Sequence, residues 1–156
     1  MSEWNKLDDF ISKWRCKKVF PYLDKKLNCL DIGCGQNGRF LFSIKDRINS
    51  GVGFDLKLKN ELINGNITLK KGDFNIDNTV YDVVTLMAVL EHIHNRVDFL
   101  KLIYNKLALN GKFILTVPDK SSQWLLEFMA YKLKIINREE IEDHKHYYNK
   151  LEIIKV

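Results

Sequence analysis

The chain has 156 residues, a net charge of +5 and 46% hydrophobic residues, which predicts a single domain with a full hydrophobic core. No apolar run reaches the roughly 18 residues of a membrane-spanning helix, and the polar start of the chain lacks the apolar region of a signal peptide. The lysines are dispersed, so no basic stripe indicates a nucleic-acid surface. Three scattered cysteines, Cys16, Cys29 and Cys34, favour reduced thiols and a cytoplasmic location.

The first half of the chain alternates helical and strand patterns. Helical spacing of Trp4, Leu7 and Trp14 predicts an amphipathic helix over about the first eighteen residues, and Pro21 predicts a short second helix over 22–27. The later predicted elements follow in chain order: a strand at 29–32, a helix from Arg39, a strand at 51–55, a short helix near 58–63 and a strand at 67–70.

The second half continues this alternation. The β-branched run at 81–86 predicts a fourth strand, and apolar spacing predicts a helix over 97–107. Asn110-Gly111 is expected to turn the chain into a fifth strand at 112–117, which Pro118 ends, and 121–133 is expected to be helical. Strands that alternate with helices indicate an α/β fold with a parallel sheet covered on both faces.

A glycine-rich turn follows the first predicted strand. The run Asn28-Cys29-Leu30-Asp31-Ile32-Gly33-Cys34-Gly35-Gln36-Asn37-Gly38 contains a literal G-x-G-x-x-G, and Asp55 stands 20 residues after the second glycine. In α/β nucleotide-binding folds such a turn approaches the ligand closely, the free N–H groups at the start of the following helix favour electronegative groups, and the later acidic residue binds a ribose. The pattern therefore predicts a nucleotide-like cofactor.

Further pieces in the expected order give the chain a family resemblance over residues 28–118. They are Asp55 at the end of the second strand, Asp73-Phe74 after the third, Tyr81-Asp82-Val83-Val84 with Leu90-Glu91-His92, and Leu109-Asn110-Gly111-Lys112. Together with the glycine turn they resemble class I S-adenosylmethionine-dependent methyltransferases. An NAD-dependent oxidoreductase is the alternative, but Asp31 would place a negative charge beside a pyrophosphate, whereas it suits an ammonium and a sulfonium.

The resemblance implies roles for residues at matching positions. Asp31 would bind the methionine ammonium, and Gly33, Cys34 and Gly35 would let the backbone approach the methionyl and ribose groups. Asp55 would accept hydrogen bonds from the ribose, Leu56 and Phe74 would pack against the adenine, and Asp73 would accept from its amino group. Leu86 and Met87 would line the methionyl side. Asp73 as an ordinary turn residue, and Phe74 and Met87 as core residues, remain open alternatives.

His92 is the predicted general base, because it follows the fourth strand, close to the methyl group in this fold. His94, His144 and His146 are further candidates. Glu91, His92 and His144 could form a metal site in related enzymes that have a Glu-x-x-Glu-His cluster, but Ala88 replaces the first glutamate, so no metal is predicted. Trp124, Leu125, Phe128 and Met129 could line an acceptor pocket or pack as core.

The prediction is thus one methyltransferase domain over 1–156, with an N-terminal helical segment (1–27), a cofactor-binding core (28–118) and a helical substrate-side segment (119–156). The implied fold is a Rossmann-like sheet of order 3-2-1-4-5 that lacks the family's last two strands, so a second copy or another partner could cover its fifth strand. The implied function is S-adenosylmethionine-dependent methylation of a small-molecule or lipid-like acceptor. A cofactor-binding interaction module without catalysis is the alternative.

Overall fold

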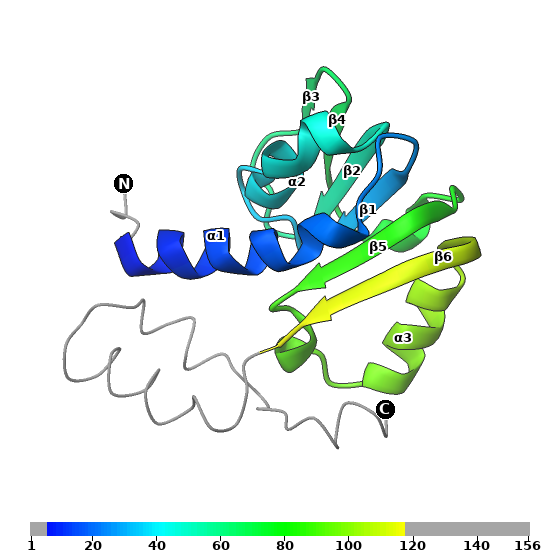
Figure 1. The fold of residues 1–156 in the computed structure, drawn as a ribbon. Helices are drawn as coiled ribbons and strands as arrows, with labels where there is room; N and C mark the ends of the chain where they lie inside the picture. Colours follow the sequence, from blue (N-terminus) through cyan, green and yellow to red (C-terminus); the bar gives the residue numbers. More distant parts are fainter. Residues whose placement is uncertain (1–5, 118–156) are drawn as a thin grey trace, which may run out of the picture.

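A mixed six-stranded sheet forms the centre of the molecule (Figure 1). The computed structural model describes residues 6–117, with side chains from residue 13 onward. The strands are β1 (Asn28–Ile32), β2 (Ser50–Asp55), β3 (Leu62–Asn64), β4 (Ile67–Lys71), β5 (Tyr81–Met87) and β6 (Leu107–Thr116). Their order across the sheet is β3-β4-β2-β1-β5-β6, and every neighbouring pair is parallel except β3 and β4.

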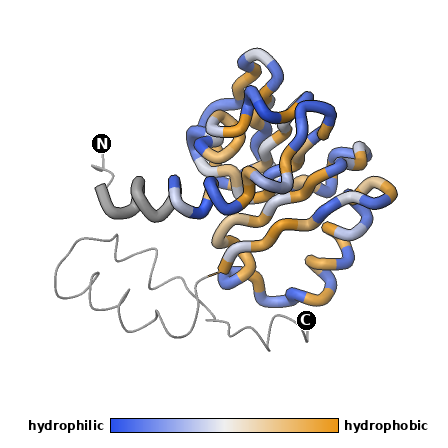
Figure 2. The backbone as a smooth tube through the Cα atoms, in the orientation of Figure 1, coloured by the Kyte–Doolittle hydropathy of each residue, from blue (hydrophilic) through white to orange (hydrophobic). Residues whose placement is uncertain are grey.

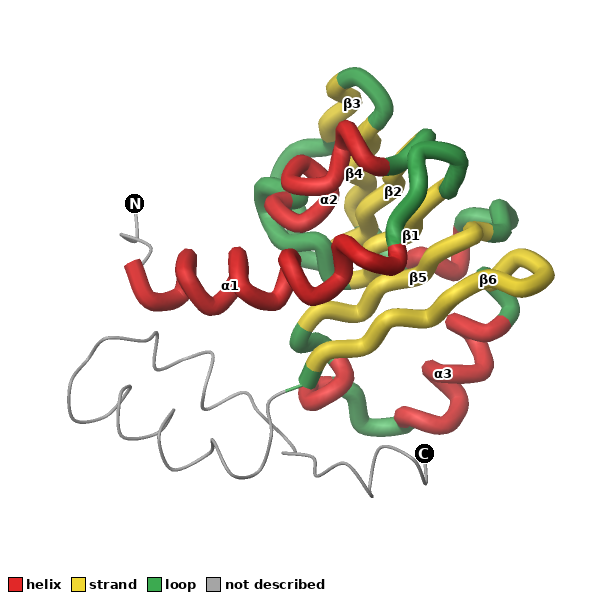
Figure 3. The backbone as a smooth tube through the Cα atoms, viewed as in Figure 1, coloured by secondary structure: helices red, strands yellow, loops and turns green. Residues whose placement is uncertain are grey.

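Helices cover both faces of this sheet. The α-helices are α1 (Lys6–Val19), α2 (Arg39–Ile44) and α3 (Arg96–Tyr104), and four single-turn 3₁₀ helices connect other elements: η1 (Phe20–Tyr22), η2 (Lys45–Arg47), η3 (Phe74–Ile76) and η4 (Leu90–His92). Figure 3 shows α1 and α2 together on one side and α3 beside β6 on the other. None of the helices within residues 6–117 is long and apolar enough to cross a membrane.

The predicted α/β fold is confirmed, and the strand order 3-2-1-4-5 recurs as β4-β2-β1-β5-β6. The central strands β1 and β5 are buried along most of their length, as is typical of parallel strands covered on both faces, whereas β4 nearer the edge alternates between buried and more exposed residues. Figure 2 shows this hydrophobic centre, with hydrophilic residues concentrated in the turns around it.

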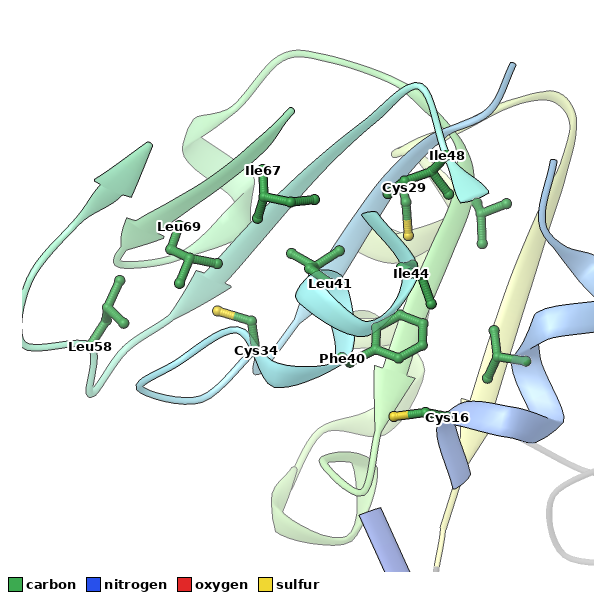
Figure 4. Close-up of a cluster of buried hydrophobic side chains, with 12 residues drawn as sticks. Cys16, Cys29, Cys34, Phe40, Leu41, Ile44, Ile48, Leu58, Ile67 and Leu69 are labelled. Carbon is green, nitrogen blue, oxygen red and sulfur yellow. The ribbon is translucent and has the colours of Figure 1, made fainter. Parts of the chain in front are cut away.

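The alternation of side chains along each strand divides the core into two layers. On one face, Cys29 of β1 packs with α1 and α2, and Figure 4 shows Phe40, Leu41 and Ile44 of α2 directed into this layer. On the other face, Leu30 of β1 packs in the layer that contains Ile103 of α3. Burial of these two layers supplies the main stabilising contribution to the fold.

Two predicted helices are wrong. In place of the helix predicted over 22–27, η1 ends at Tyr22 and residues 23–27 form a turn, in which the Asp24 carbonyl accepts the Leu27 N–H at 3.0 Å. The helix predicted near 58–63 is replaced by β3, which pairs antiparallel with β4 through Ile63 and Thr68. This hairpin adds a sixth strand at the edge opposite β6.

The boundary between the last helix and the fifth strand also differs from the prediction. The helix predicted over 97–107 ends at Tyr104, and β6 begins at Leu107 rather than at Lys112. Asn110, with φ of 61°, and Gly111 lie in an irregularity of β6, where the register with β5 shifts between Tyr81 and Val83. Within the described residues β6 is a terminal strand. The helix predicted at 121–133 lies outside the described residues, and so does the part of the chain to which the prediction about the family's last two strands refers.

Candidate cofactor-binding site

A cavity of about 630 Å³ opens at the carboxyl ends of β1, β2, β4 and β5. Its size is within the range of small-molecule sites, and its position is the one where open parallel sheets bind ligands. The lining residues come from four strand ends and from α3: Ile32, Gly33, Phe54, Asp55, Leu56, Lys57, Gly72, Asp73, Phe74, Val89, His92, Ile93 and Phe99.

The glycine turn is fastened to β2 by its own backbone. The N–H groups of Gly33 and Cys34 both donate to the carbonyl oxygen of Phe54, at 2.8 and 3.2 Å, and the N–H of Gly35 donates to Oδ2 of Asp55 at 2.9 Å. These three hydrogen bonds hold the turn against the end of β2, whereas the free N–H groups that the sequence predicted are those at the start of the following helix.

Gly33 is required by a close approach between the turn and the segment after β5. Its φ is +76°, and a Cβ at this position would lie 2.5 Å from Cγ2 of Val89. A side chain would therefore be strained and would push the two segments apart. Gly33 and Val89 both line the cavity. Their close approach therefore brings the ends of β1 and β5 together in the cavity wall.

Asp55 links the glycine turn to the loop after β2. Its Oδ2 accepts from Gly35 N–H, and its Oδ1 accepts from the N–H of Lys57 at 2.8 Å. Each carboxylate oxygen can accept a second hydrogen bond, so the side chain can still receive two hydroxyl groups from the cavity. The neighbouring Leu56 is 73% exposed and lines the same cavity, which makes it available to pack against a ligand.

The turn after β4 supplies a second carboxylate and an aromatic wall. Asp73 caps η3, because its Oδ1 accepts from Asn75 N–H at 2.9 Å. Phe74 is buried and packs edge-to-face on Phe99 of α3, with ring centroids 5.6 Å apart. Phe74 is therefore a core residue and a cavity-lining residue at once.

Asp31 is a buried carboxylate behind the glycine turn. It is 1% exposed, and its Oδ1 accepts from the hydroxyl of Thr85 on β5 at 2.7 Å. Burial raises the pKa of Asp31 to about 7, an effect that the Thr85 hydrogen bond partly offsets and that the charge of Asp55 adds to. A positively charged ligand group nearby would therefore stabilise the ionised form of Asp31.

The other predicted methionyl-side residues are core residues in this structure. Leu86 is fully buried in the layer against α3, and Met87 packs against the opposite layer. Burial raises the pKa of Cys34 to about 12, so its thiol stays protonated and acts as a small turn residue. These three residues, with Asp31 and Gly35, do not line the cavity, whereas the predicted residues Gly33, Asp55, Leu56, Asp73, Phe74 and His92 do.

The segment after β5 carries His92, the predicted base, and two unusual features. Ala88 has a left-handed backbone with φ of 57°, which is uncommon outside glycine. Glu91 is fully buried, and neither of its carboxylate oxygens has a hydrogen-bond partner. Burial raises the pKa of Glu91, while the nearby charges of His92 and Arg15 lower it.

No metal centre is present among the described residues, where no three His, Cys, Asp or Glu side chains are grouped to hold an ion. Glu91 and His92 lie together in η4, and His144, the third candidate ligand, lies outside residues 6–117. His146 and the four candidate pocket residues Trp124, Leu125, Phe128 and Met129 lie outside them as well. His94 is exposed and does not line the cavity.

Several cavity residues were missed from the sequence. Val89 and Ile93 flank the predicted Leu90-Glu91-His92 block, and their position directly after a strand was an available signal. Phe99 was assigned only to the apolar face of a helix. Its place in the cavity follows from how α3 packs under the sheet, which no local pattern indicates.

Comparison with known proteins identifies the kind of domain. A family model described as a methyltransferase domain matches residues 4–155 of this chain. A search of the curated proteins gave no significant match.

Solved structures share the fold at low sequence identity. An S-adenosylmethionine-dependent methyltransferase from Archaeoglobus fulgidus is 22% identical over 93% of this chain and 65% of its own, with a TM-score of 0.67. The plantazolicin methyltransferase BpumL, solved with a substrate analog and SAH, is 18% identical over 94% of this chain and 60% of its own, with a TM-score of 0.67. A chain from the complex of the Haloferax volcanii Trm112 methyltransferase activator with a methyltransferase is 17% identical over 99% of this chain and 75% of its own, with a TM-score of 0.66. The chain thus spans less than two thirds of the first two proteins.

Proposed function

Because this chain belongs to the class I S-adenosylmethionine-dependent methyltransferase family, we propose that it transfers a methyl group from this cofactor to a small-molecule or lipid-like acceptor. The cavity at the carboxyl ends of β1, β2 and β4, with Asp55 in its wall, is the observation that carries the proposal. Its volume, its two carboxylates and its aromatic wall fit a nucleoside with a charged amino-acid tail.

The β2 and β4 ends would hold the adenosine part of the cofactor. Asp55 has acceptor capacity left for the ribose hydroxyls after its bonds to Gly35 and Lys57. Leu56 and Phe74 would pack against the adenine from two sides of the cavity. Asp73 stands beside Phe74 and would accept a hydrogen bond from the adenine amino group.

The β1 and β5 ends would hold the methionyl part. Asp31, whose ionised form is disfavoured by burial, would gain from the ammonium and the sulfonium. Gly33, Cys34 and Gly35 would let the backbone lie against this part, while Leu86 and Met87 would support it from the core.

A sulfonium supplies an already activated methyl group, so the residues of this chain need mainly to orient the acceptor and exclude water. His92 lines the cavity after β5 and would accept the proton of an acceptor hydroxyl or amine. Val89, Ile93 and Phe99 give the same wall an apolar character, which supports an acceptor with an apolar part.

Binding of S-adenosylhomocysteine and of NAD, each measured by thermal shift and calorimetry, tests the proposal. We expect S-adenosylhomocysteine to raise the melting temperature and NAD to leave it unchanged, since the buried carboxyl of Asp31 lies behind the glycine turn and its negative charge would oppose a pyrophosphate. Methyl transfer to a panel of small-molecule and lipid acceptors then separates an enzyme from a cofactor-binding interaction module. NAD binding without S-adenosylhomocysteine binding would favour an oxidoreductase instead.

A further inference from the structure

Gln36, at the tip of the glycine turn, joins two segments that are distant in sequence. Its side-chain amide donates from Nε2 to the carbonyl oxygen of Lys57 at 2.5 Å and accepts at Oε1 from the N–H of Lys59 at 3.0 Å. Both ends of one exposed side chain are thus bonded to the backbone of the loop after β2. An exposed glutamine ordinarily keeps several rotamers, so this ordered arrangement has an entropic cost that the two bonds offset.

The Gln36 bridge runs parallel to the Asp55 bridge. Asp55 connects the N–H of Gly35 to the N–H of Lys57 through its carboxylate, and Gln36 connects the next residue of the turn to the same loop. Leu56 lies between the two bridges. Its side chain is 73% exposed, so packing against the core does not fix its position. The loop is anchored at its two ends, where the Asp55 carbonyl accepts the N–H of Gly72 at 3.1 Å and Leu58 is buried in the core, and the two bridges hold the exposed stretch between them against the glycine turn.

This doubly bridged loop is a wall of the cofactor cavity. Asp55, Leu56 and Lys57 all line it, whereas Gln36 stands outside the lining. Gln36 therefore acts on a ligand in the cavity through the segments that it joins, the glycine turn and the loop after β2. Loops that are already ordered before binding lose less conformational entropy when the ligand arrives.

We propose that Gln36 is a positioning residue that sets affinity for the adenosine part of the cofactor by holding the loop of residues 55–57 against the glycine turn. The proposal rests on the proposed function of the same cavity. It requires the glutamine side chain specifically, because a donor and an acceptor must both reach across: asparagine is one methylene shorter, and glutamate lacks the donor.

Calorimetric titration of S-adenosylhomocysteine and of adenosine into the variants Gln36→Ala, Gln36→Asn and Gln36→Glu tests this role. We expect the Kd of both ligands to rise about tenfold for the alanine and asparagine variants, as the loss of two hydrogen bonds predicts. Gln36→Glu keeps an acceptor for Lys59 N–H but sets a carboxylate oxygen against the carbonyl oxygen of Lys57, so it should lose at least as much affinity as the alanine variant. Melting temperatures of the unliganded variants should stay close to that of the unmodified protein, because Gln36 is exposed.

Asn66 offers a matched control at the opposite end of the sheet. Its side-chain amide donates to three carbonyl oxygens, those of Lys45, Ile48 and Asn49, at 2.9, 3.2 and 3.2 Å. Asn66→Ala should lower the melting temperature and leave the Kd of S-adenosylhomocysteine unchanged, the reverse of Gln36→Ala.

The possible outcomes separate the two proposals. If the unmodified protein binds neither ligand, both this role and the proposed function are wrong. If the unmodified protein binds both ligands and Gln36→Ala binds them with the same Kd, only the role of Gln36 is wrong. The same conclusion holds if Gln36→Ala behaves like Asn66→Ala, with a lower melting temperature and an unchanged Kd. A loss of about tenfold in Gln36→Ala that neither Gln36→Asn nor Gln36→Glu restores, with the melting temperature unchanged, supports it.

Discussion

The β2 and β4 side of the cavity uses its carboxylates differently from the β1 and β5 side. Asp55 and Asp73 are half-buried or exposed, and each accepts hydrogen bonds from backbone amides. Asp31 and Glu91 are buried, with one side-chain donor and none respectively. The carboxylates of the first side are thus oriented by hydrogen bonds before any ligand binds. On the second side, burial makes the ionised form of each carboxylate energetically unfavourable.

This difference matches the two ends of the proposed cofactor. An adenosine is neutral and is recognised by acceptors that are already oriented, as Asp55 is by Gly35 and Lys57. A methionyl sulfonium is positively charged, and its charge would offset part of the cost of burying Asp31 behind the cavity wall. The left-handed Ala88 lies on this second side too, where backbone strain is typical of functional segments.

The largest expected effect concerns the pH dependence of stability through Asp31. Its pKa is raised in the folded protein to about 7, so its stabilising contribution is complete below about pH 4 and is lost as the pH rises through 7. Relative to Asp31→Asn, we expect the unmodified protein to lose up to about 4 kcal/mol of unfolding free energy between pH 4 and pH 8. Urea unfolding of both proteins at each pH measures this, and parallel profiles would contradict it.

Asp55→Ala tests the other side of the cavity. We expect the Kd of S-adenosylhomocysteine to rise about 100-fold, because the variant loses a charged acceptor for the ribose and the bonds that order the turn. Asp82→Ala is the control, since Asp82 accepts the N–H of Asn28 at 2.8 Å at the far ends of β1 and β5. The control should lose stability and keep its affinity. An unchanged Kd in Asp55→Ala would show that the adenosine part binds elsewhere.

Glu91→Met should stabilise the protein by about 2 kcal/mol at pH 8, since it removes a buried charge and two unpaired oxygens while keeping a side chain of similar length. The pKa of Glu91 is raised by burial, so the unmodified side chain is more often neutral at low pH and the gain should shrink toward pH 5. Chemical denaturation at both pH values gives the difference. Destabilisation at pH 8 would instead mean that the Glu91 charge supports the fold.

Local patterns predicted the parts of the fold that depend on local chemistry. The apolar runs identified β1, β2, β4 and β5, and the spacing from the glycine turn located Asp55 at a strand end. The β3 strand was missed because Leu62 and Ile63 fit a helical pattern equally well. Their strand geometry comes from hydrogen bonds to β4, which are contacts that no short window of sequence contains.

The sequence by itself determined most of the strands and the acidic residues at their ends, because periodicity and glycine placement are local constraints, and the family resemblance of its motifs implied the order of five of the six strands. Only the tertiary structure decided how those residues act. It showed that the turn amides donate to Phe54 and Asp55, and that Gln36 bridges to the loop after β2. These arrangements depend on which backbone groups meet once the sheet has formed, and hydrogen bonds between distant segments are settled by that packing.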